Sequence, residues 1–290
     1  METSTNIYLN GEFLPREEAR ITVMDRGFLF GDGVYEVIPC YSGRLFRLGH
    51  HLKRLDDSLA GIRMENPHGA ARWREILEAL VAQQPCTEMS LYLQVTRGST
   101  GGRDHAIPRG IPPTVFAMTM PFEEPDPKLA LEGVKAVTLD DLRWHLCNIK
   151  AITLLANVLA KQEARDQGAV EAILVRDGLA HEGAASNLFI VEQGVVTTPP
   201  KSHNLLPGIT RDLVLELALR KGIPAREEEI TEQRLVQADE LWLTSSTKEV
   251  IPVTHLNDNP VGNGRPGPMF QRMASLYADY KARIKAGLEE

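Results

Sequence analysis

The chain has 290 residues, of which 43% are hydrophobic and 24% are charged, and its formal net charge is −7. This length suggests about two domains, and the composition excludes a disordered or fibrous chain. The negative charge argues against a surface that binds nucleic acid or an anionic membrane. We therefore expect a globular protein with no nucleic-acid partner.

The cysteines and the N-terminal residues indicate the cellular compartment of the protein. Cys40, Cys86 and Cys147 are odd in number, lie far apart and show no metal-ligand spacing, so we interpret them as reduced core thiols. The first residues lack the pattern of a signal peptide, and no stretch approaches the roughly 18 apolar residues of a membrane span. The sequence predicts a cytoplasmic protein with no membrane partner.

The first 120 residues alternate strand and helix patterns. Asn10-Gly11, within residues 7–13, is a strong hairpin signal. Alternating and helical periodicities predict three further strands and two helices, the strands over 33–41, 90–97 and 114–120 and the helices over 49–60 and 71–83. These elements predict a small N-terminal α/β domain over 1–120.

Two segments interrupt this pattern. Residues 99–113 show no periodicity, and loops of this length inside a compact domain are usually functional. Residues 121–127 contain three prolines and three acidic residues. We expect the interdomain linker at 121–127 and the second domain over 128–290.

The second half mixes hairpins with helices. Asp177-Gly178 and Gln193-Gly194 predict two successive hairpin turns. Strands are expected at 134–139 and 241–245 and helices at 152–167, 210–221 and 269–286, with Thr210 as an N-cap. Strands grouped as meanders with interspersed helices indicate an α+β fold with mixed sheets.

Lys150 is flanked by Ile149, Ala151 and Ile152, directly before a predicted helix. An apolar setting disfavours the charged form of an amine and frees its lone pair to attack a carbonyl. A lysine at a helix start whose amine reaches water explains the same flanks. By itself, the pattern favours this second explanation.

A second group of residues lies between 182 and 211. Glu182 follows a hairpin turn among small residues, which suits a carboxylate held against a ligand and equally a turn residue in water. Pro207 and Gly208 precede a helix start, where unpaired N–H groups and the positive dipole end suit a phosphate. Thr210 adds a hydroxyl, although an ordinary N-cap has the same residues.

The spacing from Glu182 through Asn187 and Thr198 to residues 206–211 resembles the signature of class IV (fold type IV) pyridoxal-phosphate aminotransferases. The resemblance covers nearly the whole chain, with further matching blocks at 25–36, 51–55 and 146–158. It implies an α+β, two-domain fold. The smaller N-terminal domain is α/β, and the larger C-terminal domain is a mixed, β-barrel-like sheet with helices.

The resemblance also implies the cofactor pyridoxal 5′-phosphate and the residues that bind it. Lys150 would attach the cofactor covalently, and Glu182 would face the pyridine nitrogen and keep it protonated. The phosphate would be bound by Arg54, Ile209, Thr210 and Ser246, with Ile209 acting through its backbone N–H. Residues 182–186 carry alanines where some relatives have serines, which implies fewer hydrogen bonds around the ring.

Arg103 and His105 in the long loop resemble the Arg-x-His pair of D-amino acid aminotransferases. With a tyrosine, here Tyr35, that pair binds the substrate carboxylate, for which the guanidinium fork is suited. A solvated loop would contain the same residues without a ligand. The resemblance implies a ping-pong transfer from a D-amino acid to a 2-oxo acid. It also implies a homodimer in which Arg103 and His105 reach the neighbouring subunit's site.

Other functions stay open. Within the class they are an (R)-selective amine aminotransferase, a branched-chain aminotransferase and an aminodeoxychorismate lyase, and outside it a cofactor-binding interaction protein without activity. A site built for a carboxylate would reject simple amines by ~10⁴–10⁵. No metal is expected, because His50 and His51 are adjacent and diverge on a helix. Residues 31–33 lack the strand, glycine turn and helix of a dinucleotide site.

Overall fold

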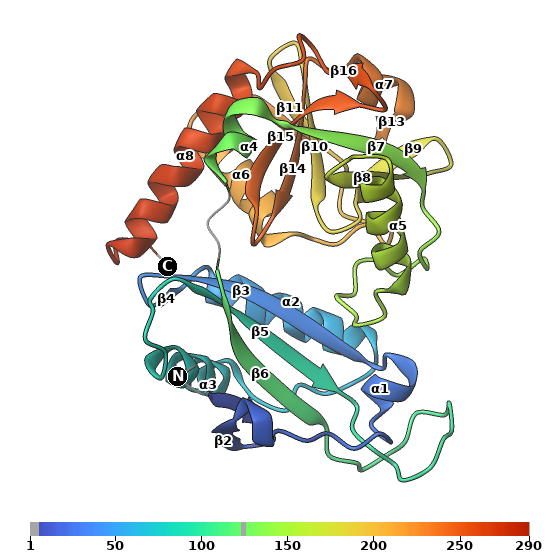
Figure 1. Cartoon of the computed structure of the whole chain (residues 1–290), viewed down its shortest axis with the longest axis vertical. Helices are drawn as coiled ribbons and strands as arrows, with labels where there is room; N and C mark the ends of the chain where they lie inside the picture. The colour runs from blue at the N-terminus through green and yellow to red at the C-terminus, as the bar shows by residue number, and fades with distance from the viewer. Residues whose placement is uncertain (1–5, 123–125, 290) are drawn as a thin grey trace. The chain divides into compact units, whose positions relative to one another are not determined.

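The computed structural model describes residues 6–122 and 126–289, and the chain forms two compact units (Figure 1). The first comprises the residues up to 123 with 149–153 and 283–290, and the second comprises 124–148 and 154–282. The linker expected at 121–127 includes 123–125, which lie outside the described residues, and the domain limits 1–120 and 128–290 stay a prediction. Every described helix is too short or too polar to cross a membrane.

The first unit is built on a six-stranded antiparallel sheet in the order β2-β1-β6-β5-β3-β4. Its strands are Asn6–Leu9 (β1), Glu12–Pro15 (β2), Gly33–Tyr41 (β3), Arg44–Leu45 (β4), Met89–Thr96 (β5) and Thr114–Pro121 (β6). The hairpin predicted at Asn10-Gly11 is confirmed, and both residues have the positive φ that such a turn requires.

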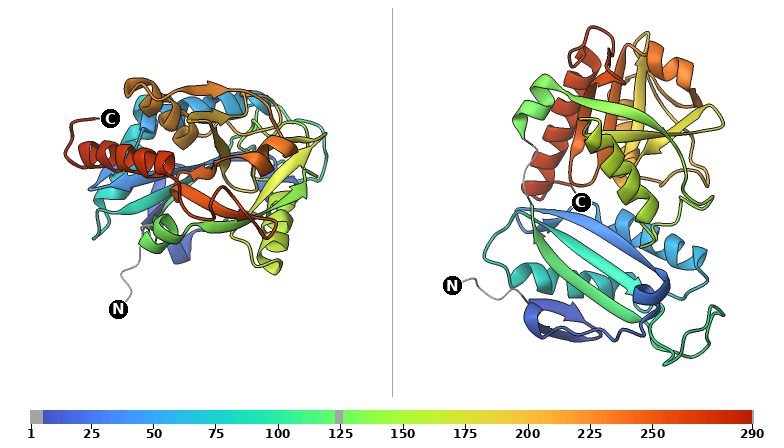
Figure 2. Two further views of the ribbon diagram at one scale, coloured as in Figure 1. Left: turned by 90° about the horizontal axis from the view of Figure 1, so that it is seen from above. Right: turned by 45° about the vertical axis from the view of Figure 1, so that its right-hand side comes forward.

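Helices α2 (Leu48–Gly61) and α3 (Ala70–Ala82) pack on one face of this sheet (Figure 2). Both lie within two residues of the predicted ranges. Their apolar sides and alternate residues of β3, β5 and β6 form one buried core. Two short helices were not predicted, the 3-10 helix η1 (Arg16–Glu18) and α1 (Arg26–Phe30).

The second unit contains a ten-stranded sheet, six strands of which close into a barrel. These six are Val134–Asp140 (β7), Glu171–Arg176 (β8), Leu179–Gly183 (β9), Asn187–Glu192 (β10), Glu240–Ser245 (β14) and Glu249–Leu256 (β15). The order β10-β14-β15-β7-β8-β9 returns to β10 where Asn187 pairs with Glu182. Because β7 runs parallel to β8 and β15 and the other barrel pairs are antiparallel, the predicted mixed, barrel-like sheet is confirmed.

The remaining elements surround this barrel. The strands are Val195–Thr198 (β11), Ala225–Glu227 (β12), Ile230–Thr231 (β13) and Asn259–Pro260 (β16). The helices are Pro127–Glu132 (α4), Leu155–Asp166 (α5), Ile209–Arg220 (α6), Glu232–Gln237 (α7) and Pro268–Lys285 (α8). The hairpin turns predicted at 177–178 and 193–194 are confirmed by the β8–β9 and β10–β11 pairings.

Three sequence predictions are wrong. Helix α5 starts at Leu155 rather than at 152, because the Ile152 N–H donates to the Gly33 carbonyl and Ala151 forms a β-bridge with Val34, which hold this segment against β3. The N-cap of α6 is Gly208, and Thr210 lies inside the first helical turn. Cys86 is exposed rather than in the core, although all three cysteines are free thiols as expected.

Candidate active site

Lys150 lies at the centre of a tight turn, closed by the Ala151 N–H on the Ile149 carbonyl at 2.8 Å, that the first unit holds from two sides. Its N–H donates to Ser58 Oγ at 3.1 Å, and its carbonyl accepts from the Tyr35 N–H at 3.0 Å. The half-buried side chain reaches over Tyr35, with Nζ 4.2 Å from the centre of the ring. The backbone is therefore fixed between α2 and β3, while the amine extends across an aromatic face.

Arg54 is held by Glu36 in a two-point ion pair. Its Nε lies 2.8 Å from Oε1 of Glu36, and its Nη2 lies 2.7 Å from Oε2. His51, one turn earlier on α2, places Nδ1 2.7 Å from the same Oε2. All three side chains are buried. The orientation of the Arg54 guanidinium is thus set by β3 and by its own helix.

The charges in this group follow from its contacts. Burial alone would raise the pKa of Glu36, but Arg54 and His51 outweigh it and lower the pKa to about 2. Burial lowers the pKa of His51, so its imidazole is neutral at pH 7. Its Nε2 has no hydrogen-bond partner among the residues described. The positive charge of Arg54 is therefore balanced by the negative charge of Glu36.

Glu182 lies where β9 meets β10 and is buried. Its Oε1 accepts from Nη1 of Arg143 at 2.6 Å. Its Oε2 accepts from Nδ2 of Asn187 at 3.1 Å and from the Leu206 N–H at 3.0 Å. Burial raises the pKa of Glu182 to about 7, although the Arg143 guanidinium and the Leu206 amide oppose the shift.

Arg143 is a site residue that sequence reasoning missed. Besides Glu182, it contacts Asp141, with Nε 2.9 Å from Oδ1 and Nη2 3.0 Å from Oδ2. Arg176 approaches the same Oδ2 at 3.2 Å. The available signal was an acid and an arginine two positions apart, directly after a predicted strand. The contact between Arg143 and Glu182 joins the segment after β7 to β9, which are far apart in the sequence. Such a contact leaves no local sequence pattern.

The N-terminus of α6 has the groups that a phosphate requires. Its N-cap is Gly208, which has no side chain to satisfy the first-turn N–H groups, and Ile209 and Thr210 behind it are buried. A Cβ at Gly208 would lie 1.8 Å from Asn187 Oδ1, so only glycine fits. A buried helix start with no side-chain cap in the described chain fits an anion such as a cofactor phosphate.

The other predicted residues have fewer contacts. Ser246 lies half-buried in the turn between β14 and β15. Tyr35 stacks on Tyr92 with ring centres 5.7 Å apart. Arg103 and His105 are exposed, and both contact Phe30 of α1, at 5.1 and 5.0 Å from its ring centre. Within the described chain no contact joins Tyr35 to Arg103 or His105.

The predicted residues therefore fall into two groups, each described within its own unit. The first unit brings Lys150 to Tyr35 and places Arg54 on the helix that contacts the Lys150 backbone. The second unit brings Glu182, Asn187 and the segment before α6 together. It also contains Ile209, Thr210 and Ser246.

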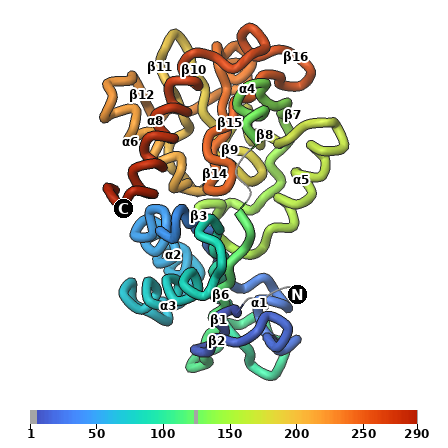
Figure 3. Tube along the Cα trace, turned by 60° about the vertical axis from the view of Figure 1, so that its left-hand side comes forward, coloured from blue at the N-terminus to red at the C-terminus, as the bar shows by residue number. Residues whose placement is uncertain are grey.

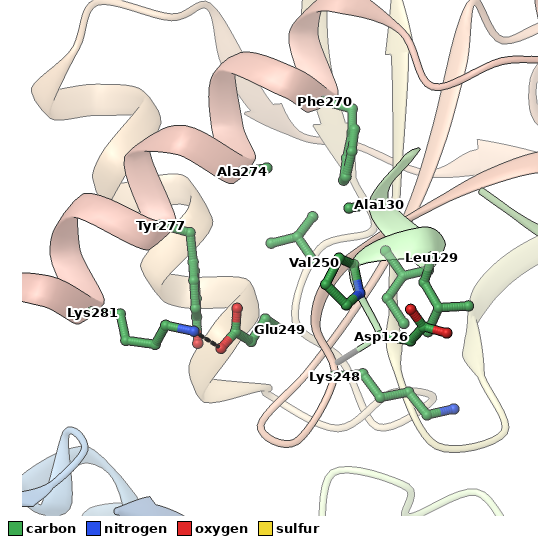
Figure 4. Close-up of a pocket in the computed structure, with 12 residues that line it drawn as sticks. Asp126, Leu129, Ala130, Lys248, Glu249, Val250, Phe270, Ala274, Tyr277 and Lys281 are labelled. Carbon is green, nitrogen blue, oxygen red and sulfur yellow. Dashed lines mark hydrogen bonds and ion pairs between the residues drawn. The ribbon is translucent and has the colours of Figure 1, made fainter. Parts of the chain in front are cut away.

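The second unit also has a cavity of about 160 Å³ beside α8 (Figure 4). Lys281 Nζ and Glu249 Oε1, both in its lining, are 2.7 Å apart, and Tyr277 lies next to them. None of the residues predicted for the site lines this cavity. It is separate from the candidate active site.

Comparisons with known proteins agree on one family. A family model described as amino-transferase class IV matches residues 33–256. A D-alanine aminotransferase of Bacillus licheniformis is 43% identical over 267 residues, which cover 92% of this chain and 94% of that protein. One of Listeria monocytogenes is 38% identical, with 98% of both chains covered. The structure of a branched-chain amino acid aminotransferase from T.th. with pyridoxamine 5′-phosphate has a TM-score of 0.92 and 26% identity, covering 99% of this chain and 97% of that one.

Proposed function

Because this chain belongs to the class IV aminotransferases, we propose that it transfers the amino group of a D-amino acid, such as D-alanine, to a 2-oxo acid, such as pyruvate or 2-oxoglutarate. Its cofactor is pyridoxal 5′-phosphate. The observation that carries the choice of substrate is the 43% identity to a D-alanine aminotransferase over almost the whole chain. The structure named for branched-chain amino acids shares only 26% of its residues.

The residues of this chain fit that cofactor. Lys150 attaches it covalently, and the α6 N-terminus with Ile209 and Thr210 binds its phosphate, together with Arg54 and Ser246. Glu182 faces the pyridine nitrogen. Support comes from the buried, glycine-capped start of α6 and from the burial of Glu182.

The chemistry divides between the cofactor and the chain. When bound, pyridoxal phosphate supplies an aldehyde that captures amines and a ring that withdraws electrons from the substrate Cα. Lys150 Nζ removes the proton from Cα of the donor and later delivers one to Cα of the new amino acid. Glu182 hydrogen-bonds the ring nitrogen and keeps its proton in place.

Recognition of the substrate carboxylate is assigned to Tyr35, Arg103 and His105. We place the last two in the neighbouring subunit's site of a homodimer. This placement is supported by their exposure and by the lack of any contact to Tyr35 in the chain described. A cytoplasmic location is supported by the three free thiols.

A donor panel tests the function. The holoenzyme is given D-alanine, L-alanine, L-leucine or a simple primary amine, with 2-oxoglutarate as acceptor. We expect fast pyruvate formation from D-alanine and an amine rate lower by ~10⁴–10⁵, because the amine leaves the Arg103 guanidinium unpaired. Lys150→Ala should abolish turnover while the phosphate contacts still bind the cofactor.

With aminodeoxychorismate added as a further substrate, each alternative enzyme of the class has its own outcome in this panel, and an inactive interaction protein would turn over none of these compounds. A rate with L-leucine above that with D-alanine would indicate a branched-chain aminotransferase. A rate with the primary amine equal to that with D-alanine would indicate an (R)-selective amine aminotransferase. Pyruvate release from aminodeoxychorismate without amino transfer would indicate a lyase. Any of these results would contradict the proposed D-amino acid specificity.

A further inference from the structure

Helix α1 and the loop 99–113 lie side by side in the first unit (Figure 3) and are joined by one buried arginine. Arg26 is 4% exposed. Its Nη1 donates to the Asp104 carbonyl at 2.5 Å, and its Nη2 donates to the His105 carbonyl at 3.4 Å. One guanidinium therefore holds the backbone of the two residues that follow Arg103.

Arg26 is itself held in place by Asp32. Its Nε lies 2.8 Å from Asp32 Oδ2. Arg97 contacts the same carboxylate with two nitrogens, at 2.8 and 3.0 Å, and also donates to the Ile62 carbonyl at 2.6 Å. Ile62 is the C-cap of α2. Arg26 is therefore anchored to this helix through Asp32 and Arg97.

The base of the loop is attached to the same helix. The Arg26 N–H donates to the Gly98 carbonyl at 2.8 Å. The N-cap residue Asp25 accepts from Thr96 Oγ1 at 2.8 Å and from Thr114 Oγ1 at 2.6 Å. These threonines end β5 and begin β6, so both ends of the loop are attached to the start of α1.

Phe30, at the other end of α1, supports the side chains of the loop. The guanidinium carbons of Arg26 and Arg103 lie 4.9 and 5.1 Å from its ring centre, and the His105 ring lies 5.0 Å away. In the described chain, the side chains of Arg103 and His105 contact the Phe30 ring and form no hydrogen bond. Their directions are thus determined by their backbone and by Phe30.

We infer that Arg26, fixed by Asp32, is a positioning residue for the binding of the substrate carboxylate. By holding the carbonyls of Asp104 and His105, it orients the Arg103 and His105 side chains before the substrate arrives. Arg26 does not touch the substrate, because its three guanidinium nitrogens are bonded to Asp32 and to the loop. This inference rests on the proposed function, in which Arg103 and His105 bind that carboxylate.

The test compares Arg26→Met, Arg26→Lys and Arg103→Gln in the holoenzyme. KM and kcat for D-alanine are measured together with the inhibition constant of propionate, a carboxylate without an amino group. We expect Arg26→Met to raise both KM and the propionate constant by about 10- to 100-fold, taking as a guide the loss seen when a residue that orients a metal-binding side chain is removed. kcat should change much less, and Arg26→Lys, which keeps the charge but lacks the planar fork that spans Asp32 and both carbonyls, should lie between.

Arg109→Gln is the matched control, because it removes an exposed arginine from the same loop and should leave both constants unchanged. If Arg26→Met does not fold, Phe30→Leu replaces it, since Phe30 is half-buried at the surface. We expect that variant to raise KM and the propionate constant together, by a smaller factor.

The outcomes separate this inference from the function on which it rests. The inference is overturned if Arg103→Gln raises KM and the propionate constant while the Arg26 and Phe30 variants leave both unchanged. It is also overturned if kcat falls and the two constants do not move. If the parent does not use D-alanine, the proposed function fails, and if Arg103→Gln changes neither constant, the assignment of the carboxylate to Arg103 fails. In either case the inference fails with it.

Discussion

Glu36 in the first unit and Glu182 in the second are both buried carboxyl groups that bond to an arginine, yet their pKa values shift in opposite directions. Glu36 accepts from two nitrogens of Arg54 and is contacted by His51, and its pKa falls to about 2. Glu182 accepts from a single nitrogen of Arg143, and its pKa rises to about 7.

The difference lies in how each arginine is shared. Arg54 directs two nitrogens at Glu36, whereas Arg143 directs two at Asp141 and one at Glu182. Burial therefore prevails at Glu182, and the Asp141 charge adds to its effect. Glu36 stays ionised as a structural anchor, while Glu182 changes protonation near neutral pH, and a protonated ring nitrogen beside it would favour its ionised form.

The largest effect on stability is expected for Glu36→Gln. The change leaves Arg54 buried without its carboxylate, and breaking a buried ion pair costs about 3–5 kcal/mol. Urea denaturation of the cofactor-free protein at pH 7 measures the loss. The control is Asp57→Asn, which removes an exposed pair with Lys53 and should have no measurable effect. Equal losses in the two variants would contradict the anchoring role of Glu36.

A smaller loss of stability is expected for Glu182→Gln. The glutamine oxygen can still accept from Asn187 and Leu206, but its amide group meets the Arg143 donor, at a cost of about 1–3 kcal/mol. Turnover of D-alanine should fall by about 10²–10³, as when one preorganised polar group is removed from an active site. A stability loss larger than that of Glu36→Gln would reverse the comparison.

The pH dependence of stability should separate the two carboxyls. Glu36 has a folded pKa below its usual value of 4.5, so its contribution is complete above pH 4.5 and is lost as the pH falls toward 2. Glu182 has a raised folded pKa, so its contribution is complete below pH 4.5 and is lost as the pH rises through about 7.

Urea midpoints of the cofactor-free protein between pH 3 and pH 8 measure both trends. In Glu36→Gln the urea midpoint should change less with pH on the acid side. In Glu182→Gln it should change less with pH near neutrality. Asp57→Asn should keep both trends. If Glu182→Gln leaves the neutral side unchanged, the protonation change belongs to another group.

The smallest effect on the pH dependence is expected for Asp141→Asn, a change that also lowers stability because Asp141 is buried between Arg143 and Arg176. Removing this charge lets Arg143 act on Glu182 alone, so the pKa of Glu182 should fall and the neutral side of the profile should move to lower pH. Asp140→Asn, at the exposed neighbouring position, should leave the profile in place. A shift to higher pH in Asp141→Asn would contradict the role given to Asp141.

Local periodicity predicted the elements that present the site more accurately than the segment that holds its lysine. Strand β3 was predicted with both ends because its alternation stops at a Ser-Gly turn, and α2 was predicted from leucine spacing. Residues 149–153 form a turn with one β-bridge to Val34 instead of a helix. Apolar neighbours suit either conformation, and the deciding hydrogen bond of Ile152 is to Gly33, far away in the sequence.

The same limit applies to the charged contacts. Lys150, Arg54 and Glu182 were recognised because each lies in a motif with fixed spacing. Arg143 and Arg26 act on residues 39 and 78 positions away, Glu182 and Asp104, and only the closed barrel and the folded loop bring these together. Partners joined by tertiary folding leave no periodic pattern in the sequence.

Covalent attachment of the cofactor to Lys150 is tested most directly by borohydride reduction of the holoenzyme and peptide mapping by mass spectrometry. We expect the added pyridoxyl mass on the peptide that contains Lys150, and no adduct in Lys150→Ala. Lys248 is the sharpest competitor, because burial lowers the pKa of its amine. The pyridoxyl mass on Lys248 or on any other lysine, or no adduct at all, would contradict the assignment.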